Sequence, residues 1–275
     1  MQQYSVITEN LNKSFDVDSV LKNLDLKIIK GEIMAIVGPS GCGKTTTLRL
    51  IAGFEQPDKG KIILGDTIVA DEKTFLPPEK RGVGMVFQDF ALFPHLTVAE
   101  NISFGIKSKD KEKIREEVDS LLELVALNNL GDRFPHELSG GQRQRVSLAR
   151  ALAPKPDLIL MDEPFSNIDA DTRLIIREEV RKILKKLKTT AIFVTHDQEE
   201  ALFMGDRLAV MNEGELEQIG TPENVFQQPK SRFVAEFMGN TDFIPGVISK
   251  KGIKTEIGEL EQRINLPIGT KIDIA

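Results

Sequence analysis

The sequence predicts an α/β protein built around a largely parallel sheet. Three continuous apolar runs lie far apart in the chain, at Ile33–Val37, Leu158–Met161 and Ala191–Thr195, and such runs are typical of strands buried on both faces. Between them, residues 171–188 have the spacing of an amphipathic helix. Strands that alternate with helices pair in parallel through right-handed crossovers. The apolar face of this helix is predicted to carry Ile176, Val180, Ile183, Leu184 and Leu187.

Before the first of these strands, the chain alternates between apolar and polar residues. Leu24, Leu26 and Ile28 are separated by Asp25 and Lys27, which predicts a strand that is half-buried. Residues 84–87 also resemble a strand, and residues 89–153 then have an almost wholly helical pattern. We therefore predict a helical insertion between strands, with a charged helix over residues 111–126.

The chain changes character again near Gly239. We expect a main domain over residues 1–238, followed at 239–275 by the start of a β-rich domain that is incomplete and too short for a robust core of its own. The chain stops inside an apparent strand at residues 273–275. The short strands of this segment are predicted around Val247, Ile248, Ile253, Ile257, Ile264 and Ile272.

The composition excludes several classes of protein. The chain has 275 residues, 40% of them apolar and 28% charged, which excludes collagen-like and disordered chains. The formal net charge of −6 argues against nucleic acid as a partner, because Lys and Arg dominate that binding. Cys42 is the single cysteine and favours a reducing compartment. We expect no secretion signal at residues 1–4 and no membrane span.

A glycine-rich segment follows the run Ile33–Val37. Residues 38–45 fit the pattern G-x-x-x-x-G-K-[ST], in which backbone N–H groups curl around phosphate oxygens. Lys44 can reach the β- and γ-phosphates of a nucleotide, and the Thr45 hydroxyl can hold Mg²⁺. The positive end of the helix that follows adds to this attraction. A glycine-rich turn after a strand is the alternative, but the strand, loop and helix context favours a nucleotide site.

Polar side chains also follow the other predicted strands. Asp162 and Glu163 end one buried run, where adjacent carboxylates need a cation or hydrogen bonds. We predict that Asp162 joins the magnesium shell and that Glu163 acts as general base on an attacking water. His196 is expected at the same sheet edge. Gln88 is expected to orient water or to contact Mg²⁺. Taken singly, each could also be an ordinary polar residue at a strand end.

The segment 138–142, Leu-Ser-Gly-Gly-Gln, precedes a predicted helix that runs to Ala153. Ser139 would cap that helix, and the glycines would expose backbone N–H groups to an anion. Read alone, this is a flexible cap. Together with residues 143–150, however, it resembles the signature of ATP-binding cassette (ABC) proteins.

Over roughly residues 4–238 the chain is similar to that family, and the remaining motifs occur in order. The resemblance implies a P-loop NTPase fold with a RecA-like mixed sheet, an antiparallel β subdomain and the helical insertion. It departs from the common pattern at Phe15, where Trp or Tyr is usual, and at Ile168, where Leu is usual. The implied nucleotide-binding residues are Phe15 on adenine and Gly38, Pro39, Ser40, Gly41, Cys42, Gly43, Lys44, Thr45 and Thr46 on the phosphates.

The resemblance also implies a mechanism. Cassettes pair head to tail as a homodimer, so that each ATP lies between the phosphate loop of one subunit and the signature of the other. Glu163, His196, Gln88 and Lys44 would be catalytic, and Asp169 would couple the two sites. Mg²⁺ would be held by Thr45, Gln88 and Asp162, and the signature contacts in trans would come from Ser139, Gly140, Gly141 and Gln142.

Residues 77–88 and 195–201 resemble the importer ATPases for ferric iron, maltose, sulfate and polyamines. This implies integral membrane permease subunits docked near Gln88–Thr97, a solute-binding protein as an indirect partner, and a peripheral position on the cytoplasmic face of the inner membrane. Residues 75–78 and 88–90 lean toward ferric iron as the cargo, with sugar, sulfate or polyamine as alternatives. A P-loop small-molecule kinase and a non-transport ABC ATPase are the competing functions.

Overall fold

The computed structural model describes residues 3–239, 242–261 and 265–274. The chain divides into two units, Met1–Glu223 and Asn224–Ala275. The sequence-based boundary after residue 238 therefore lies inside the second unit, which includes helix α8 (Arg232–Met238). Within the described residues, no helix has the length and apolar character needed to cross a bilayer.

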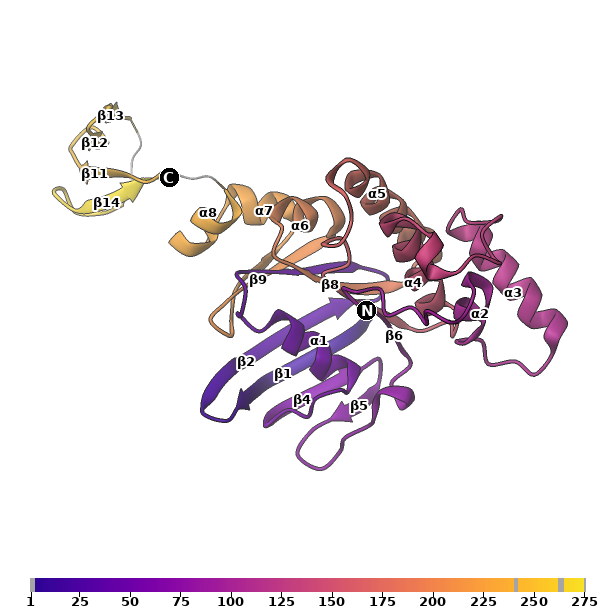
Figure 1. Cartoon of the computed structure of the whole chain (residues 1–275). Coiled ribbons are helices and arrows are strands. Elements are labelled where there is room, and N and C mark those ends of the chain that lie inside the picture. Colours follow the sequence, from indigo (N-terminus) through magenta and orange to yellow (C-terminus); the bar gives the residue numbers. More distant parts are fainter. Residues whose placement is uncertain (1–2, 240–241, 262–264, 275) are drawn as a thin grey trace. The chain divides into compact units, whose positions relative to one another are not determined.

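The centre of the first unit is a six-stranded mixed sheet in the order β10-β9-β3-β8-β7-β6. Figure 1 labels β6, β8 and β9 of this sheet. β3 pairs in parallel with β8 and β9, β7 pairs in parallel with β6 and β8, and β10 is antiparallel to β9. All three predicted apolar runs are strands of this sheet. The strands are β3 (Ile33–Val37), β6 (Val83–Val86), β7 (Leu158–Asp162), β8 (Thr190–Thr195), β9 (Arg207–Asn212) and β10 (Glu215–Gly220).

A second sheet is antiparallel and has the order β2-β1-β4-β5. In β2, Leu24, Leu26 and Ile28 are buried while Asp25 and Lys27 are exposed, as the alternating pattern predicts. One apolar core joins this sheet, helix α1 (Lys44–Ala52) and the central strands, so α1 is fixed between them. The strands are β1 (Tyr4–Phe15), β2 (Asp18–Ile29), β4 (Lys59–Leu64) and β5 (Thr67–Ala70), and a 3₁₀ turn, η1 (Pro78–Lys80), follows.

The helical insertion is less helical than the sequence predicts. It contains α2 (Val98–Ser103), α3 (Lys111–Leu124) and α4 (Gly140–Leu152), with a 3₁₀ turn η2 (Pro135–Glu137). The segment before α2 is irregular because Phe90 and Ala91 have positive φ angles of 63° and 45°, which a helix does not allow. The predicted helix over 111–126 ends at Leu124, since Ala126 has a φ of 55°.

Helix α5 (Ala170–Leu187) is the amphipathic helix of the prediction. Ile176, Val180, Ile183 and Leu184 are buried, but Leu187 is 43% exposed. Leu187 is the last residue of the helix, directly before Lys188, whose left-handed backbone ends it, so its side chain lies at the exposed end of the apolar face. Helix α6 (Gln198–Met204) follows β8.

The second unit contains α8 and a small antiparallel sheet in the order β13-β12-β11-β14. The sheet bears out the short strands predicted around Val247, Ile248, Ile253 and Ile272. Ile257 instead lies in the turn between β12 and β13 and is 72% exposed. Ile264 and Ala275 lie outside the described residues. The elements are α7 (Pro222–Gln227), at the junction, and β11 (Ile244–Ile248), β12 (Ile253–Thr255), β13 (Gly258–Leu260) and β14 (Lys271–Ile274).

Candidate functional site

The carboxyl ends of three neighbouring parallel strands form the candidate site. β3, β8 and β7 lie side by side in the central sheet, so their ends meet at one edge, where open sheets of this kind bind ligands. Gly38 follows β3, Asp162 ends β7 and His196 follows β8. The topology thus gathers three of the predicted site residues from distant parts of the chain.

The loop at residues 38–43 curls tightly before α1. A Cβ atom at Gly38 would lie 2.2 Å from the Met211 carbonyl oxygen, and Gly43 has a φ of +100°, so both positions require glycine. The Lys44 ammonium donates to the carbonyl oxygens of Gly38 and Pro39, each at 2.8 Å. Lys44 therefore lies inside the loop, where an anion held by the backbone N–H groups would meet its charge.

Cys42 and Thr46 also belong to this predicted phosphate site. Cys42 is 4% exposed, with its Sγ 3.9 Å from the Lys44 Nζ. Burial raises the pKa of the Cys42 thiol, and the nearby Lys44 charge opposes that rise only in part. The residue is therefore a small buried side chain rather than a reactive thiolate. Thr46 is half-buried in the first turn of α1.

Thr45 and Asp162 form an oxygen-rich pair beside the loop. The Thr45 Oγ1 donates to the Asp162 Oδ1 at 3.0 Å. Burial, with the neighbouring charge of Glu163, raises the pKa of Asp162 against the opposing effect of the Thr45 hydrogen bond. Among the described residues, no group of three His, Cys, Asp or Glu side chains could hold a metal alone. A hydroxyl and one carboxylate suit Mg²⁺, which completes its shell with substrate phosphates and water.

Gln88 is placed differently from this pair. Its side chain is exposed, and its described hydrogen bond is through the backbone, where its carbonyl accepts from the Asn167 Nδ2 at 2.8 Å. This bond joins the segment after β6 to the segment 166–169. The structure thus ties the backbone of Gln88 to the segment that leads to Asp169, while its exposed side chain stays a predicted magnesium ligand.

Glu163 and His196 face each other at the sheet edge. The Glu163 Oε1 lies 3.2 Å from the His196 Nδ1, with 23% of the glutamate side chain and 56% of the histidine side chain exposed. Glu163 has a φ of 43°, a conformation that costs energy for a residue with a Cβ. It is held by its N–H donating to the Val194 carbonyl at 3.1 Å and by Ser166. This strained turn directs the carboxylate away from the strand and toward the histidine.

The predicted signature forms the capped start of α4. The Ser139 Oγ accepts from the Gln142 N–H at 3.3 Å, and the Gln142 Oε1 accepts from the Ser139 N–H at 2.9 Å, which is a capping box. A Cβ atom at Gly140 would lie 3.0 Å from the Asn167 carbonyl, and one at Gly141 would lie 3.0 Å from Ile176. The two glycines therefore let this helix end pack closely against the start of α5.

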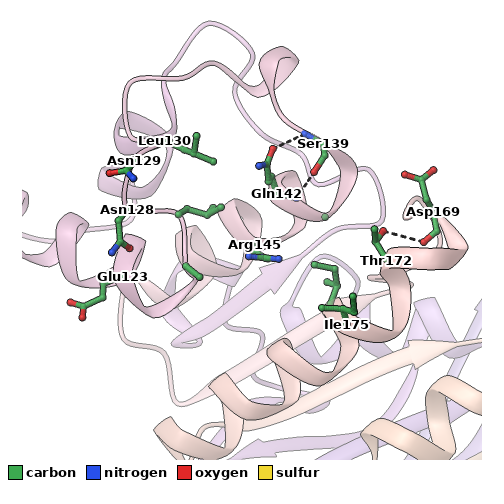
Figure 2. Close-up of a pocket in the computed structure, with 14 residues that line it drawn as sticks. Glu123, Asn128, Asn129, Leu130, Ser139, Gln142, Arg145, Asp169, Thr172 and Ile175 are labelled. Atoms are coloured by element: carbon green, nitrogen blue, oxygen red, sulfur yellow. Dashed lines mark hydrogen bonds between the residues drawn. The ribbon is translucent and has the colours of Figure 1, made fainter.

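A cavity of about 710 Å³ opens beside this helix end. Figure 2 shows Ser139 and Gln142 on one wall, Thr172 and Ile175 of α5 on another, and the loop with Asn128 and Asn129 across from them. Asp169, at the start of α5, lines the same cavity. The signature and the predicted coupling residue are thus neighbours within one chain.

Phe15 ends β1 and is 40% exposed, with the Lys13 ammonium 5.1 Å from its ring centroid. A half-exposed ring of this kind can stack on a base.

The segment near Gln88–Thr97 contributes to an apolar groove of about 360 Å³. Phe93 and Phe104 contact each other with ring centroids 4.8 Å apart, and Phe104 is 70% exposed. Sequence reasoning identified the segment but missed Phe54 and Phe104, which line the same groove. The sequence contains little indication of these two residues, because a single aromatic residue next to a glycine can be either buried or exposed.

Asn101 is another residue that the sequence did not reveal. It is fully buried. Its side-chain oxygen accepts from the Phe93 N–H at 2.9 Å. Its side-chain nitrogen donates to the carbonyl oxygens of Phe93, Leu96 and Thr97 at 2.9 to 3.1 Å. One amide therefore sets the shape of the loop that forms the groove.

Comparison with known proteins identifies the class. A family model described as ABC transporter matches residues 21–166. The chain belongs to the ABC transporter family and has its ATPase cassette fold. A cassette from the dimeric MJ0796 structure bound to ADP and Pi superimposes with a TM-score of 0.69 and 33% identity, over 79% of this chain and 98% of that one. CbiO1 from Clostridium perfringens gives a TM-score of 0.75 and 30% identity, over 82% of this chain and 92% of that chain.

Several similar curated proteins are import ATP-binding proteins. The spermidine/putrescine import protein PotA of Pseudomonas fluorescens is 51% identical over 84% of this chain and 62% of its own length. The trehalose/maltose import protein MalK of Thermococcus litoralis is 46% identical over 92% and 69%. The Fe(3+) ions import protein FbpC of Fusobacterium nucleatum is 44% identical over 94% and 68%. The chain thus spans about two thirds of the length of these relatives.

Proposed function

We propose that this chain binds and hydrolyses ATP as the cassette subunit of an ABC importer. The observation that carries the proposal is the contact of 3.2 Å between the Glu163 carboxylate and the His196 ring, at the sheet edge that also holds the phosphate loop and the Thr45–Asp162 pair. A base, an orienting group and an anion site side by side are the parts that phosphoryl transfer to water requires.

Each residue has a distinct task in this proposal. The loop N–H groups and Lys44 hold the phosphates, and Glu163 accepts a proton from the attacking water while His196 fixes the carboxylate and faces the γ-phosphate. Thr45 and Asp162, with Gln88 as a further ligand, would hold Mg²⁺, which neutralises charge on the phosphate oxygens when bound. Phe15 stacks on the adenine ring.

A second copy of the chain completes each site. The capped start of α4 exposes an N-terminal helix end beside Ser139, Gly140, Gly141 and Gln142, which suits the phosphates of a nucleotide on the partner. Head-to-tail pairing gives two equivalent sites. It would also bring Asp169 to the interface, where it couples the two sites. The dimeric state named for the MJ0796 cassette supports this arrangement.

The importer role requires a membrane partner. The apolar groove lined by Phe54, Phe87, Phe93 and Phe104 is suited to an apolar segment of a permease subunit, so that the chain acts at the cytoplasmic face of the membrane and meets the solute-binding protein only indirectly. Residues 239–275 would begin a regulatory domain.

The cargo is proposed as a class. The relatives are named for polyamine, sugar, ferric iron and sulfate import, at 44 to 51% identity. Ferric iron, the prediction from residues 75–78 and 88–90, is the first cargo to test by ATP-dependent uptake with the permease, followed by the other three.

A substitution at Ser139 separates this proposal from a P-loop kinase. Aspartate caps a helix as well as serine does, so Ser139→Asp keeps α4 intact but places a negative charge against the partner's nucleotide. We expect it to abolish ATP hydrolysis by the purified chain. Ser231 caps α8 in the same way, and Ser231→Asp is the matched control. Full activity of Ser139→Asp would favour a single-chain kinase site.

A further inference from the structure

A buried charge cluster joins α5 to the segment that carries His196. Arg177 of α5 is 5% exposed, and its Nη2 donates to the Asp197 Oδ2 at 2.9 Å and to the Glu200 Oε1 at 2.6 Å. The other oxygen of Glu200 accepts from the Thr195 Oγ1 at 2.6 Å. The Arg177 guanidinium therefore holds Asp197 directly and Thr195 through Glu200, and these two residues lie on either side of His196.

Local hydrogen bonds close the cluster. The Thr195 Oγ1 also accepts from the Asp197 N–H at 3.0 Å, and the Asp197 Oδ1 caps α6 by accepting from the Glu200 N–H at 3.1 Å. Glu200 is 4% exposed. Desolvating such charges is costly, and apolar residues of similar volume often hold two helices together equally well. The hydrogen bonds of the cluster hold Thr195 and Asp197, the residues on either side of His196.

The same face of α5 carries further basic residues at intervals of four. Arg173 donates to the Ile168 carbonyl at 3.0 and 3.3 Å, directly before Asp169. Arg181 donates to the Met204 carbonyl at 3.3 Å, and Lys185 pairs with Asp206. Residues four apart lie along one side of a helix. Arg177 is the member of this row whose partners flank His196.

We propose that Arg177 is a positioning residue that sets the place of the His196 ring relative to Glu163. The inference rests on the proposed hydrolysis of ATP, since His196 has a catalytic role only in that reaction. Arg177 also links His196, through α5, to the segment that contains Asp169. In the proposed dimer, a second copy of the chain would contact that segment. Arg177 itself lies buried behind the site and acts through Thr195, Asp197 and Glu200.

Kinetics of the full chain test the positioning role. Arg177→Lys keeps the positive charge, but the lysine side chain is one bond shorter and does not reach the position from which the Arg177 Nη2 donates to both carboxylates. We expect kcat for ATP to fall by roughly ten- to a hundredfold with KM unchanged, because misplacing a reacting group by about 1 Å costs on the order of a hundredfold. Arg181→Met, the matched control, removes contacts with Met204 and Asp206 that do not touch residues 195–200, and it should leave kcat unchanged.

A spectroscopic measurement tests the same inference without turnover. The chain has three histidines, His95, His136 and His196, so imidazole signals of a ¹⁵N-histidine-labelled sample can be assigned. Arg177→Lys should shift only the His196 signals, and Arg181→Met none. Glu200→Gln, which keeps the shape of the cluster, serves as the second variant if Arg177→Lys does not fold, and it should also shift only His196.

The outcomes separate the two proposals. Unchanged kcat together with an unchanged His196 signal in a folded variant overturns the positioning role. Equal losses in Arg177→Lys and Arg181→Met also overturn it, because they would reflect general packing of α5. If the wild-type chain does not hydrolyse ATP, the proposed function fails, while the histidine spectra still decide whether Arg177 sets the environment of His196.

Discussion

At the scale of single residues, backbone conformation positions the side chains of the candidate site. Glu163 is forced into a positive φ of 43° directly after β7, and this turn brings its carboxylate to His196. Gly38 is equally constrained, since any side chain there would meet the carbonyl of Met211. The functional groups are thus aimed by strained or glycine-only positions, as is common where strain is maintained by surrounding structure.

Gly38→Ala tests this constraint. The added methyl would lie 2.2 Å from the Met211 carbonyl oxygen, so the loop or β9 must shift. We expect weaker ATP binding and a loss of about 1–3 kcal/mol in the free energy of unfolding, which is typical of overpacking. Nucleotide titration and urea unfolding measure the two effects.

Gly131→Ala is the matched control for this substitution. The nearest neighbour of its added methyl would be 3.5 Å away, so we expect wild-type affinity and stability. Tight ATP binding by Gly38→Ala would show that the loop adapts to a side chain and that glycine is not required at this position.

At the scale of elements, the sequence predicted what depends on local pattern. The apolar runs of β3, β7 and β8 and the apolar spacing of α5 were sufficient to predict these elements, because burial selects the residue type at each position. The irregular path before α2 was not predictable, since it depends on Asn101 bonding to Phe93, Leu96 and Thr97. Such tertiary hydrogen bonds leave no periodic trace in the sequence.

Glu32, which directly precedes β3, gives a prediction on pH. Burial raises the pKa of this carboxyl above its ordinary value of 4.5, and Arg207, 3.2 Å away, offsets this only in part. The folded state then binds a proton more tightly than the unfolded state. The contribution of this group to stability therefore falls as pH rises from about 4.5 through the raised pKa.

Glu32→Gln removes this titration while keeping a similar shape. We expect the free energy of unfolding of the variant to decline less than that of the wild type as the pH is raised above 4.5. Denaturant unfolding at a series of pH values measures the difference, and the exposed Glu199→Gln is the control. Identical slopes for the Glu32→Gln variant and the wild type would show that this carboxyl is not responsible.

At the scale of the whole molecule, the proposed function assigns partners to two surfaces of the chain. The capped start of α4 is proposed to meet an anion, although the phosphate loop belongs to a different part of the fold. The sequence could predict this pairing only through resemblance to a family. The groove with Phe54 and Phe104 was recognisable only once the fold had brought those residues together.

Phe104→Asp tests the second surface. Phe104 is 70% exposed at the groove, so aspartate should not disturb folding, and we expect ATP hydrolysis by the isolated chain to be unchanged. Co-purification with the permease and stimulation by it should be lost. Ile68→Asp, at an exposed apolar residue that does not line the groove, should retain both. Full permease binding by Phe104→Asp would place the docking surface elsewhere.

The most direct test of the proposed hydrolysis is the behaviour of Glu163→Gln in the full chain. This variant keeps the shape of the side chain but cannot accept a proton from water. We expect it to bind ATP, to hydrolyse it at least on the order of a hundredfold more slowly, as loss of a general base predicts, and to accumulate as an ATP-bound dimer in size-exclusion chromatography. Glu213→Gln, at a glutamate with a similar φ of 46° outside the site, should behave like the wild type. Near-normal turnover by Glu163→Gln, or a chain that stays monomeric with ATP bound, would contradict the proposed mechanism.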